Sequence, residues 1–307
     1  MMFLLAAAVG MLMPLQTCIN TRLRKRLGSP FSAAFVSVLT SMLFIAAVLY
    51  FTAGSLRLPF DKLAGEPKWI YIGGLCGVTV MTGNILLFPK LGGVQTVIFP
   101  ILGQIVTGLL IDALGLFRGN VTPLTATRVC GAMLVFIGVL TASLQHGDRQ
   151  NNSGAGINLY RLAAVMIGAI GTTQTSINGY FGRITGNPFQ TALVSSSVSF
   201  LTICVILTGM HVSGRQKLRM GDLKGDLRPW WMWLGGILGA LCLSANTVTP
   251  AHIGTGMTVI MNLLGSTAMG TLVDHFGWFN TARRPVSLRK AAGLLIMIIG
   301  AGMIRLM

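Results

Sequence analysis

Residues 16–37 read QTCINTRLRKRLGSPFSAAFVS, and residues 174–195 read QTSINGYFGRITGNPFQTALVS. The identical residues keep one offset of 158 (174 minus 16) from the opening Gln to the closing Ser of each stretch. Both stretches carry a Gly-x-Pro turn between two apolar segments. This spacing indicates an internal duplication, so the sequence predicts two related halves at 1–145 and 159–307, joined by a hinge loop at 146–158.

The duplication continues beyond these stretches at a second offset of 162 (235 minus 73), because the second half has a longer loop after residue 210. Matching pairs are spread over the rest of both halves. They are Gly73/Gly235, Gly77/Gly239, Asn84/Asn246, Gly103/Gly265, Gly108/Gly270, Asp112/Asp274, Gly115/Gly277, Phe117/Phe279, Pro123/Pro285, Gly131/Gly293 and Gly138/Gly300.

Composition identifies lipid as the solvent of most of the chain. Hydrophobic residues make up 53% and charged residues only 10%, with a mean hydropathy of +0.73, whereas soluble domains carry about 25% charged residues. A membrane-spanning helix needs about 20 apolar residues. The sequence predicts an all-α membrane protein with about ten spans, at 1–20, 31–53, 69–88, 93–113, 124–144, 159–178, 188–210, 230–250, 255–275 and 288–306.

The net charge of +16 does not indicate a nucleic-acid partner, because Lys and Arg sit in short connections between apolar runs. This is the pattern of a membrane protein whose basic loops face the cytoplasm, and the expected partner is the lipid bilayer. The five cysteines fall at wide spacing inside apolar runs, in neither a metal-binding nor a disulfide pattern. We expect no cofactor and no metal.

Five spans in each half force the second half to cross the membrane upside down relative to the first. The loop charges agree, because the basic clusters 22–26, 215–228 and 283–290 then share one side. Inverted repeats of this kind are a recurrent architecture of secondary transporters, with the binding site near the midplane between the repeats.

The segment Gly103-Gln104, followed by Gly108-Leu109-Leu110-Ile111-Asp112 and Gly115-Leu116-Phe117, resembles the signature of the YdcZ-type inner-membrane exporters of the drug/metabolite transporter superfamily. The resemblance covers nearly the whole chain, which looks like a fused pair of five-span units. It implies a ten-helix exporter fold in the bacterial inner membrane. The second half departs from the motif, because Ser266 replaces its Gln and His275 follows Asp274.

The orientation of the termini stays open at this point. The superfamily resemblance implies cytoplasmic termini, whereas the basic clusters favour termini on the outer side. Both readings place the two termini on the same side of the membrane.

Polar side chains deep inside spans are costly in lipid and usually face the bundle interior. We expect a substrate site built from Gln104, Asn84, Asn246, Ser266, Asn262, Gln16 and Gln174. Pro100, one turn before Gln104, removes a backbone hydrogen bond next to it. The alternative is that these amides only bond helices to one another, and for Asn20 and Asn178, near span ends, a capping role is favoured.

Asp112 and Asp274 are the only carboxylates attached to predicted spans. Coupling to a proton or another ion needs a group that changes protonation during the cycle, and these two are the candidates. The alternative is a structural role, in which each Asp anchors the following turn or pairs with Arg118 or Arg283.

The apolar runs contain no convergent nucleophile, acid–base pair or metal cluster, so the sequence does not favour an enzyme. It shows no ring of like charges typical of a channel. The hypothesis is a secondary transporter, exporting a small neutral or zwitterionic metabolite by alternating access. The alternative is a non-transporting membrane scaffold or assembly subunit.

Overall fold

The computed structural model describes residues 1–57, 60–119, 121–143, 156–213, 230–280, 283 and 286–305. The hinge loop predicted at 146–158 lies outside this range, apart from its last three residues. The described residues form helices and no strands. The α-helices are α1 (Met2–Leu27), α2 (Pro30–Ala53), α3 (Phe60–Leu63), α4 (Ile72–Leu114), α5 (Ala126–Ser143), α6 (Ile157–Thr185), α7 (Pro188–Val212), α8 (Leu234–Asn246), α9 (Thr249–Ile253), α10 (Thr255–Phe276) and α11 (Leu288–Arg305). Short 3-10 turns are η1 (Lys68–Tyr71), η2 (Leu116–Arg118), η4 (Trp230–Trp233) and η5 (Trp278–Asn280).

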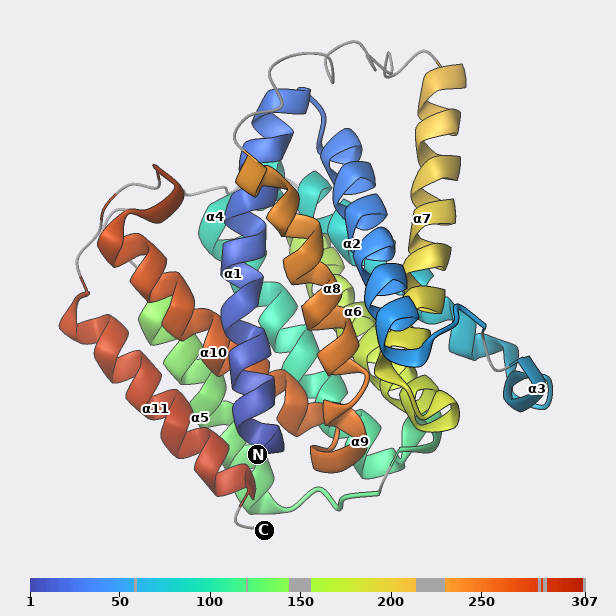
Figure 1. The fold of residues 1–307 in the computed structure, drawn as a ribbon. Helices are drawn as coiled ribbons and strands as arrows, with labels where there is room; N and C mark the ends of the chain where they lie inside the picture. Colours follow the sequence, from blue (N-terminus) through green and yellow to red (C-terminus); the bar gives the residue numbers. More distant parts are fainter. Residues whose placement is uncertain are drawn as a thin grey trace.

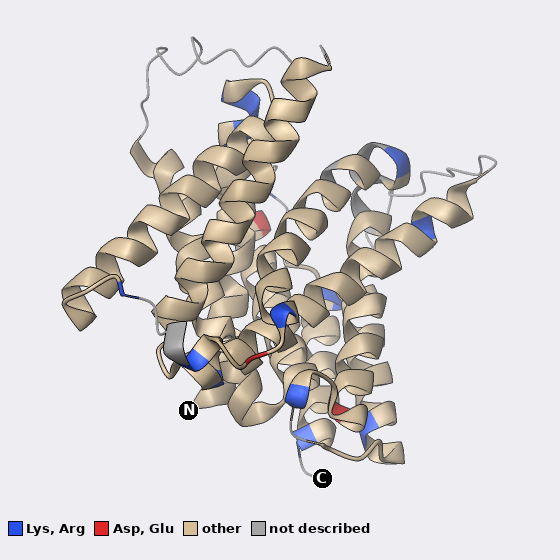
Figure 2. Ribbon diagram, turned by 90° about the vertical axis from the view of Figure 1, so that its right-hand side faces the viewer, with Lys and Arg blue, Asp and Glu red and all other residues tan. Residues whose placement is uncertain are grey.

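Seven helices in the described part of the chain are long and apolar enough to cross a membrane. They are Met2–Leu27, Pro30–Ala53, Gln95–Leu114, Ala126–Ser143, Pro188–Val212, Trp230–Ile253 and Thr255–Phe276. The other three predicted spans are also helical, in the first part of α4, in α6 and in α11. Figure 2 shows long stretches of helix without charged residues, and large apolar side chains such as Leu43, Leu201 and Val205 face outward. The prediction of an all-α membrane protein is confirmed.

The helices divide into a central group and two flanking pairs. Helices α1, α4, α6, α8 and α10 contact one another in the middle of the molecule. Helix α5 packs along α11 on one flank, and α2 packs along α7 on the other (Figure 1). Both termini lie at the same end of the bundle (Figure 1), as the sequence predicted. This end is called the terminal end below.

The spans predicted at 69–88 and 93–113 belong to one element, because α4 is helical from residue 72 to 114. A straight helix of that length would separate Gly77 from Gly108 by about 46 Å. Both glycines instead pack against the same turn of α6, Gly77 beside Gln174 and Gly108 beside Thr172. Helix α4 therefore turns back on itself and supplies two spans. In the sequence, Pro89 falls between the two predicted spans, and proline is a usual cause of sharp helix bends.

The duplicated Gly-x-Pro segments form the same turn in both halves. Gly28 (φ 66°) ends α1 and Gly186 (φ 69°) ends α6 in the left-handed conformation that suits glycine. The next residue, Ser29 or Asn187, caps the following helix with its side chain. Proline then occupies the first turn, where its missing N–H costs nothing.

The flanking pair α5 and α11 meets through glycines at two crossing points. A β-carbon on Gly138 would lie 2.6 Å from the carbonyl oxygen of Gly293, and one on Gly293 would lie 2.6 Å from that of Gly138. Gly131 and Gly300 approach each other in the same way. Small residues allow this close backbone approach, which supplies much of the attraction between helices in lipid.

We expect Gly138→Ala to lower the free energy of unfolding by about 1–3 kcal/mol, because the added methyl meets backbone that cannot move aside. Thermal unfolding of the purified protein in detergent measures this change. Gly302→Ala is the matched control on α11, since no atom lies within 4 Å of its added methyl. It should leave stability unchanged or raise it by about 1 kcal/mol. Equal melting temperatures for the two variants would contradict the proposed importance of this contact.

Candidate functional site

The amide side chains of the spans gather on the central helices. Helices α2, α5 and α11 contain no Asn or Gln, and α7 contains only Gln190, in its first turn. The sequence-predicted site residues all lie on the central group. They are Gln16 on α1, Asn84 and Gln104 on α4, Gln174 on α6, Asn246 on α8, and Asn262 and Ser266 on α10.

Four of the amides are wedged between helices against glycines. Gln16 packs against Gly239 of α8, and Gln174 packs against Gly77 of α4. Asn20 and Asn178, one turn further along, meet Gly235 and Gly73 in the same manner. The carbonyl oxygens of Asn20 and Asn178 are buried without a hydrogen-bond partner. These positions give the four amides a packing role between helices, whatever else they do.

One face of α4 and one face of α10 carry a row of residues that are spaced one helical turn apart. These two rows are called the polar faces. On α10 this face carries Asn262, Ser266, Gly270 and Asp274, and on α4 it carries Pro100, Gln104, Gly108 and Asp112. Residues four apart lie on one side of a helix. Gln104 and Ser266 are partly buried, and the backbone carbonyl of Gln104 accepts a hydrogen bond from the Thr172 hydroxyl at 3.2 Å.

The two halves differ where this face meets the amides of α4 and α8. Asn262 Nδ2 donates to Asn246 Oδ1 at 3.0 Å. The position in α4 that corresponds to Asn262 is occupied by Pro100, which has no side-chain donor. The carbonyl oxygen of Asn84, the counterpart of Asn246, is buried without a hydrogen-bond partner. An unpartnered buried carbonyl costs about 1–3 kcal/mol, so Asn84 holds unused hydrogen-bonding capacity inside the bundle.

Asp112 lies at the terminal end in a fully satisfied, buried site. Its Oδ1 accepts the backbone N–H of Thr255 at 2.7 Å, and its Oδ2 accepts that of Gly256 at 2.9 Å. Arg128 Nη2 lies 3.3 Å from the same Oδ2, and both side chains are nearly inaccessible to solvent. A carboxylate at a helix N-terminus satisfies free backbone donors and interacts favourably with the helix dipole. Asp112 therefore ties the end of α4 to the start of α10.

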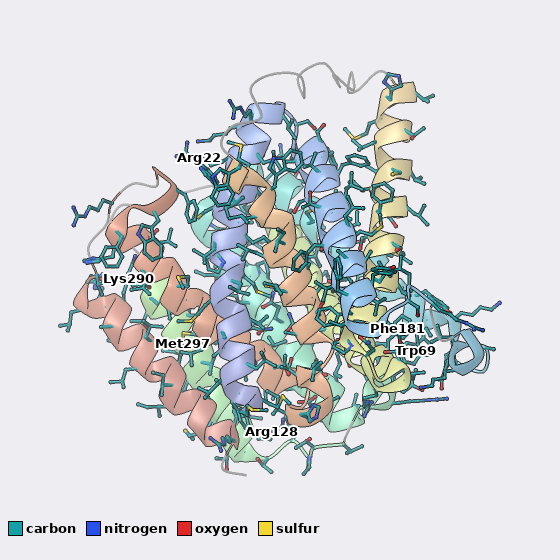
Figure 3. The ribbon with its side chains drawn as sticks, in the orientation of Figure 1. Arg22, Trp69, Arg128, Phe181, Lys290 and Met297 are labelled. Atoms are coloured by element: carbon teal, nitrogen blue, oxygen red, sulfur yellow. The ribbon has the colours of Figure 1, made fainter. Side chains whose placement is uncertain are left out.

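Asp274 occupies the corresponding position at the other end, with a different environment. Lys290 Nζ donates to its Oδ2 at 2.9 Å, and the Asp274 side chain is 37% exposed, against 3% for Asp112. Figure 3 shows Arg128 near the terminal end and Lys290 well away from it.

The ion-pair partners predicted for the two carboxylates were wrong. Arg118 donates instead to Glu66 and Tyr180, and Arg283 donates to the carbonyl of His275. The true partners, Arg128 and Lys290, lie across the tight turn that follows each Asp. The sequence carried a signal for them, because they occupy matching positions at the start of the last span of each half. The alternative that Asp112 anchors the turn after it was also wrong in its partner, because the carboxylate accepts the first backbone N–H groups of α10.

Comparison with known proteins places this arrangement in a family. Residues 1–141 and 159–303 match the family described as "Putative inner membrane exporter, YdcZ". No curated protein sequence matches the chain. A solved structure titled "Crystal structure of protein" is similar in fold, with a TM-score of 0.64, 15% identity, and coverage of 99% of this chain and 95% of that one. The match over both halves and the multi-pass helical fold lead to one conclusion: the chain belongs to the YdcZ family of inner-membrane exporters.

Proposed function

We propose that this inner-membrane protein is a secondary transporter, which exports a small, partly apolar, neutral or zwitterionic metabolite by alternating access. The metabolite would bind between the halves 1–145 and 159–307, in contact with the amides of the central helices. Membership of an exporter family supports the direction of transport. The substrate-binding and coupling roles assigned to individual residues are part of this proposal.

The observation that carries the proposal is that the side-chain carbonyls of Asn84 and Asn262 are buried inside the bundle without a hydrogen-bond partner. Amides that only hold helices together would be expected to use all their polar atoms in bonds between helices, whereas Asn262 donates through its Nδ2 to Asn246 and leaves its Oδ1 unpartnered. An amide left without a partner in an apolar bundle reduces stability, and such costs are typical of residues kept for binding. Gln104, Asn84, Asn246, Ser266 and Asn262 would form the site, with Gln16 and Gln174 at its edges.

The charges of the described residues limit the class of substrate. Asp112 and Asp274 are each paired with a cation, and they lie at opposite ends of the polar faces. The described part of those faces between them carries amides, hydroxyls and apolar side chains, without a charged side chain. A metabolite with net charge would lose its hydration there without a counter-ion. A neutral or internally compensated molecule avoids this cost.

Equivalent contacts in the two halves support their inverted arrangement. Gly74 packs against the backbone of Ser195 just as Gly236 packs against that of Ser37. The aromatic pairs Trp69–Phe117 and Trp231–Phe279 correspond in the same way. Such reciprocity is expected when an axis in the membrane plane relates two repeats, an architecture that allows the halves to rock about a shared site.

We expect Gln104→Ala to abolish ligand binding and flux while leaving the protein folded. The test screens the purified protein in detergent by thermal shift against amino acids, nucleosides, vitamins and polyamines, and measures flux of any hit in proteoliposomes. A ligand at 100 times its dissociation constant stabilises the folded state by about 2.7 kcal/mol. The control is Gln190→Ala, which removes an amide side chain from the outer helix α7. This variant should bind the ligand and transport it normally. Unchanged flux in Gln104→Ala would remove this residue from the site, and the absence of any ligand or flux would favour a scaffold.

Asn84→Leu and Asn246→Leu should change stability in opposite directions. The first substitution removes an unpartnered carbonyl and should raise the free energy of unfolding by about 1 kcal/mol, while transport falls. The second leaves Asn262 without its acceptor and should lower that free energy by about 1–2 kcal/mol. Thermal unfolding and flux of the two variants are compared side by side. Equal destabilisation by both would show that Asn84 serves only to bond helices.

A further inference from the structure

The two ends of the bundle differ in how the halves meet. At the terminal end, the Asp112 carboxylate belongs to the first half, and the Thr255 and Gly256 amides that it accepts belong to the second. Its ion pair with Arg128 stays within the first half. Asp112 thus combines an ion pair inside its own half with a contact that crosses between the halves.

Close backbone packing accompanies this cross-half contact. A β-carbon on Gly108 would lie 2.8 Å from the Cα of Gly256. Nearby, within the second half, Gly179 of α6 packs against Pro250 of α9, and Gly182 packs against Thr247. At the terminal end, α4 of the first half and α10 of the second therefore touch through their backbones at Gly108 and Gly256.

The corresponding contacts at the opposite end are not made in the part of the chain that the structure describes. Asp274 keeps the ion pair within its own half, with Lys290, but it accepts no described backbone N–H from the first half. A β-carbon added to Gly270, the counterpart of Gly108, would have no described atom within 4 Å. Among the described residues, α4 and α10 therefore meet closely where Asp112 lies, and no matching contact is seen where Asp274 lies.

The sequence contains a matching acceptor site for Asp274. Gly92, Gly93 and Val94 correspond to Gly254, Thr255 and Gly256 at the offset of 162. Gly254 (φ 80°, ψ 160°) separates α9 from α10 and so leaves the first amides of α10 free for Asp112. Helix α4 is continuous through residues 92–94 in this structure, so these amides bond within the helix. A break at Gly92, the residue type that tolerates such a conformation, would free them.

From this asymmetry we propose that Asp112 and Asp274 are alternating latches of the transport cycle, a role that rests on the function proposed above. In the state described here, Asp112 closes the terminal end by capping α10. In the other state, that contact opens, and Asp274 closes the opposite end by capping the helix that starts near Gly93. Arg128 and Lys290 hold their carboxylates in position in both states.

Two matching positions provide reporters for the two ends. Cys18 on α1 is partly exposed and lies close to Asp274 and Arg22. Its counterpart on α6 is Ser176, which is 4% exposed. Ser176 shares a face of α6 with Thr172 and Gly179, which contact the closed end. A Ser176→Cys substitution changes one atom and reports on opening of the terminal end.

The experiment measures reaction of each cysteine with a hydrophilic maleimide in the purified full-length protein, resolved by mass spectrometry of peptides. With Asp112 intact, Cys18 should react faster than the cysteine at position 176. Asp112→Asn should raise the reaction rate at position 176 by about tenfold and lower that of Cys18, because the populations of the two states shift. Asp274→Asn is the matched control, and it should keep position 176 protected while leaving Cys18 reactive.

Asp112→Asn also leaves Arg128 without its counter-ion, so a second variant tests the same contact by another route. Thr255→Pro removes the N–H that Asp112 Oδ1 accepts and preserves the Asp112–Arg128 pair. Proline is favoured at the first position of a helix, so α10 should still form. This variant should also raise the reaction rate at position 176, with gel filtration as the check on folding.

The outcomes separate the latch from transport itself. Protection at position 176 that is unchanged in folded Asp112→Asn and Thr255→Pro would overturn the latch, even in a protein that transports. The labelling needs no substrate, so opening of the terminal end in a protein without any flux would support the latch and contradict the proposed transport function.

Discussion

Close backbone contact between the two halves is the constraint on which the rest of this structure depends. Lipid provides no hydrophobic force to bring helices together, so they associate through tight packing and a few polar contacts. Gly103 meets the Val165 carbonyl of α6, and Gly265 meets the Ala7 carbonyl of α1. In both places a helix of one half lies directly on a helix of the other. The central group is held together mainly by such contacts between halves, and the flanking pairs cover it.

The same close packing explains how polar groups are distributed. Where glycine brings two backbones together, a long amide side chain such as that of Gln16 or Gln174 fills the remaining space and packs against the glycine. Gln104 and Ser266 are partly buried like Gln16 and Gln174. Exposure alone therefore does not separate a packing role from a binding role.

Much of the fold could be predicted from the sequence, because helices in lipid must satisfy their own backbone and are marked by apolar runs of known length. The turns at Gly28 and Gly186 could also be predicted, because a glycine followed by a proline two residues later marks the end of one helix and the start of the next. The continuity of α4 through Pro89 could not, since a tightly bent helix and two separate spans have the same hydropathy.

The candidate site was predictable only in part. The amides and both aspartates could be identified from their cost in lipid. Their partners depend on which face each helix presents to its neighbour, and for the ion pairs the only sequence signal was that Arg128 and Lys290 occupy matching positions in the two halves. Arg128 and Lys290 lie 16 residues after their aspartates, beyond the reach of helical periodicity. The contact of Asp112 with Thr255 joins residues 143 positions apart, and it becomes visible only in three dimensions.

The replacement of Asn262 by Pro100 at matching positions has a consequence for how a molecule could lie between the halves. A pair of identical chains must offer every group twice, so a bound molecule meets the same surroundings either way round. Covalent fusion of the halves removes that requirement. In this chain, one side presents the bonded amides Asn246 and Asn262, with the Asn262 carbonyl unpartnered, and the other presents the unpartnered carbonyl of Asn84 together with a proline position in place of a second amide. A site shared by these halves would therefore have a distinct left and right, and it could hold an unsymmetrical molecule in one orientation throughout its passage.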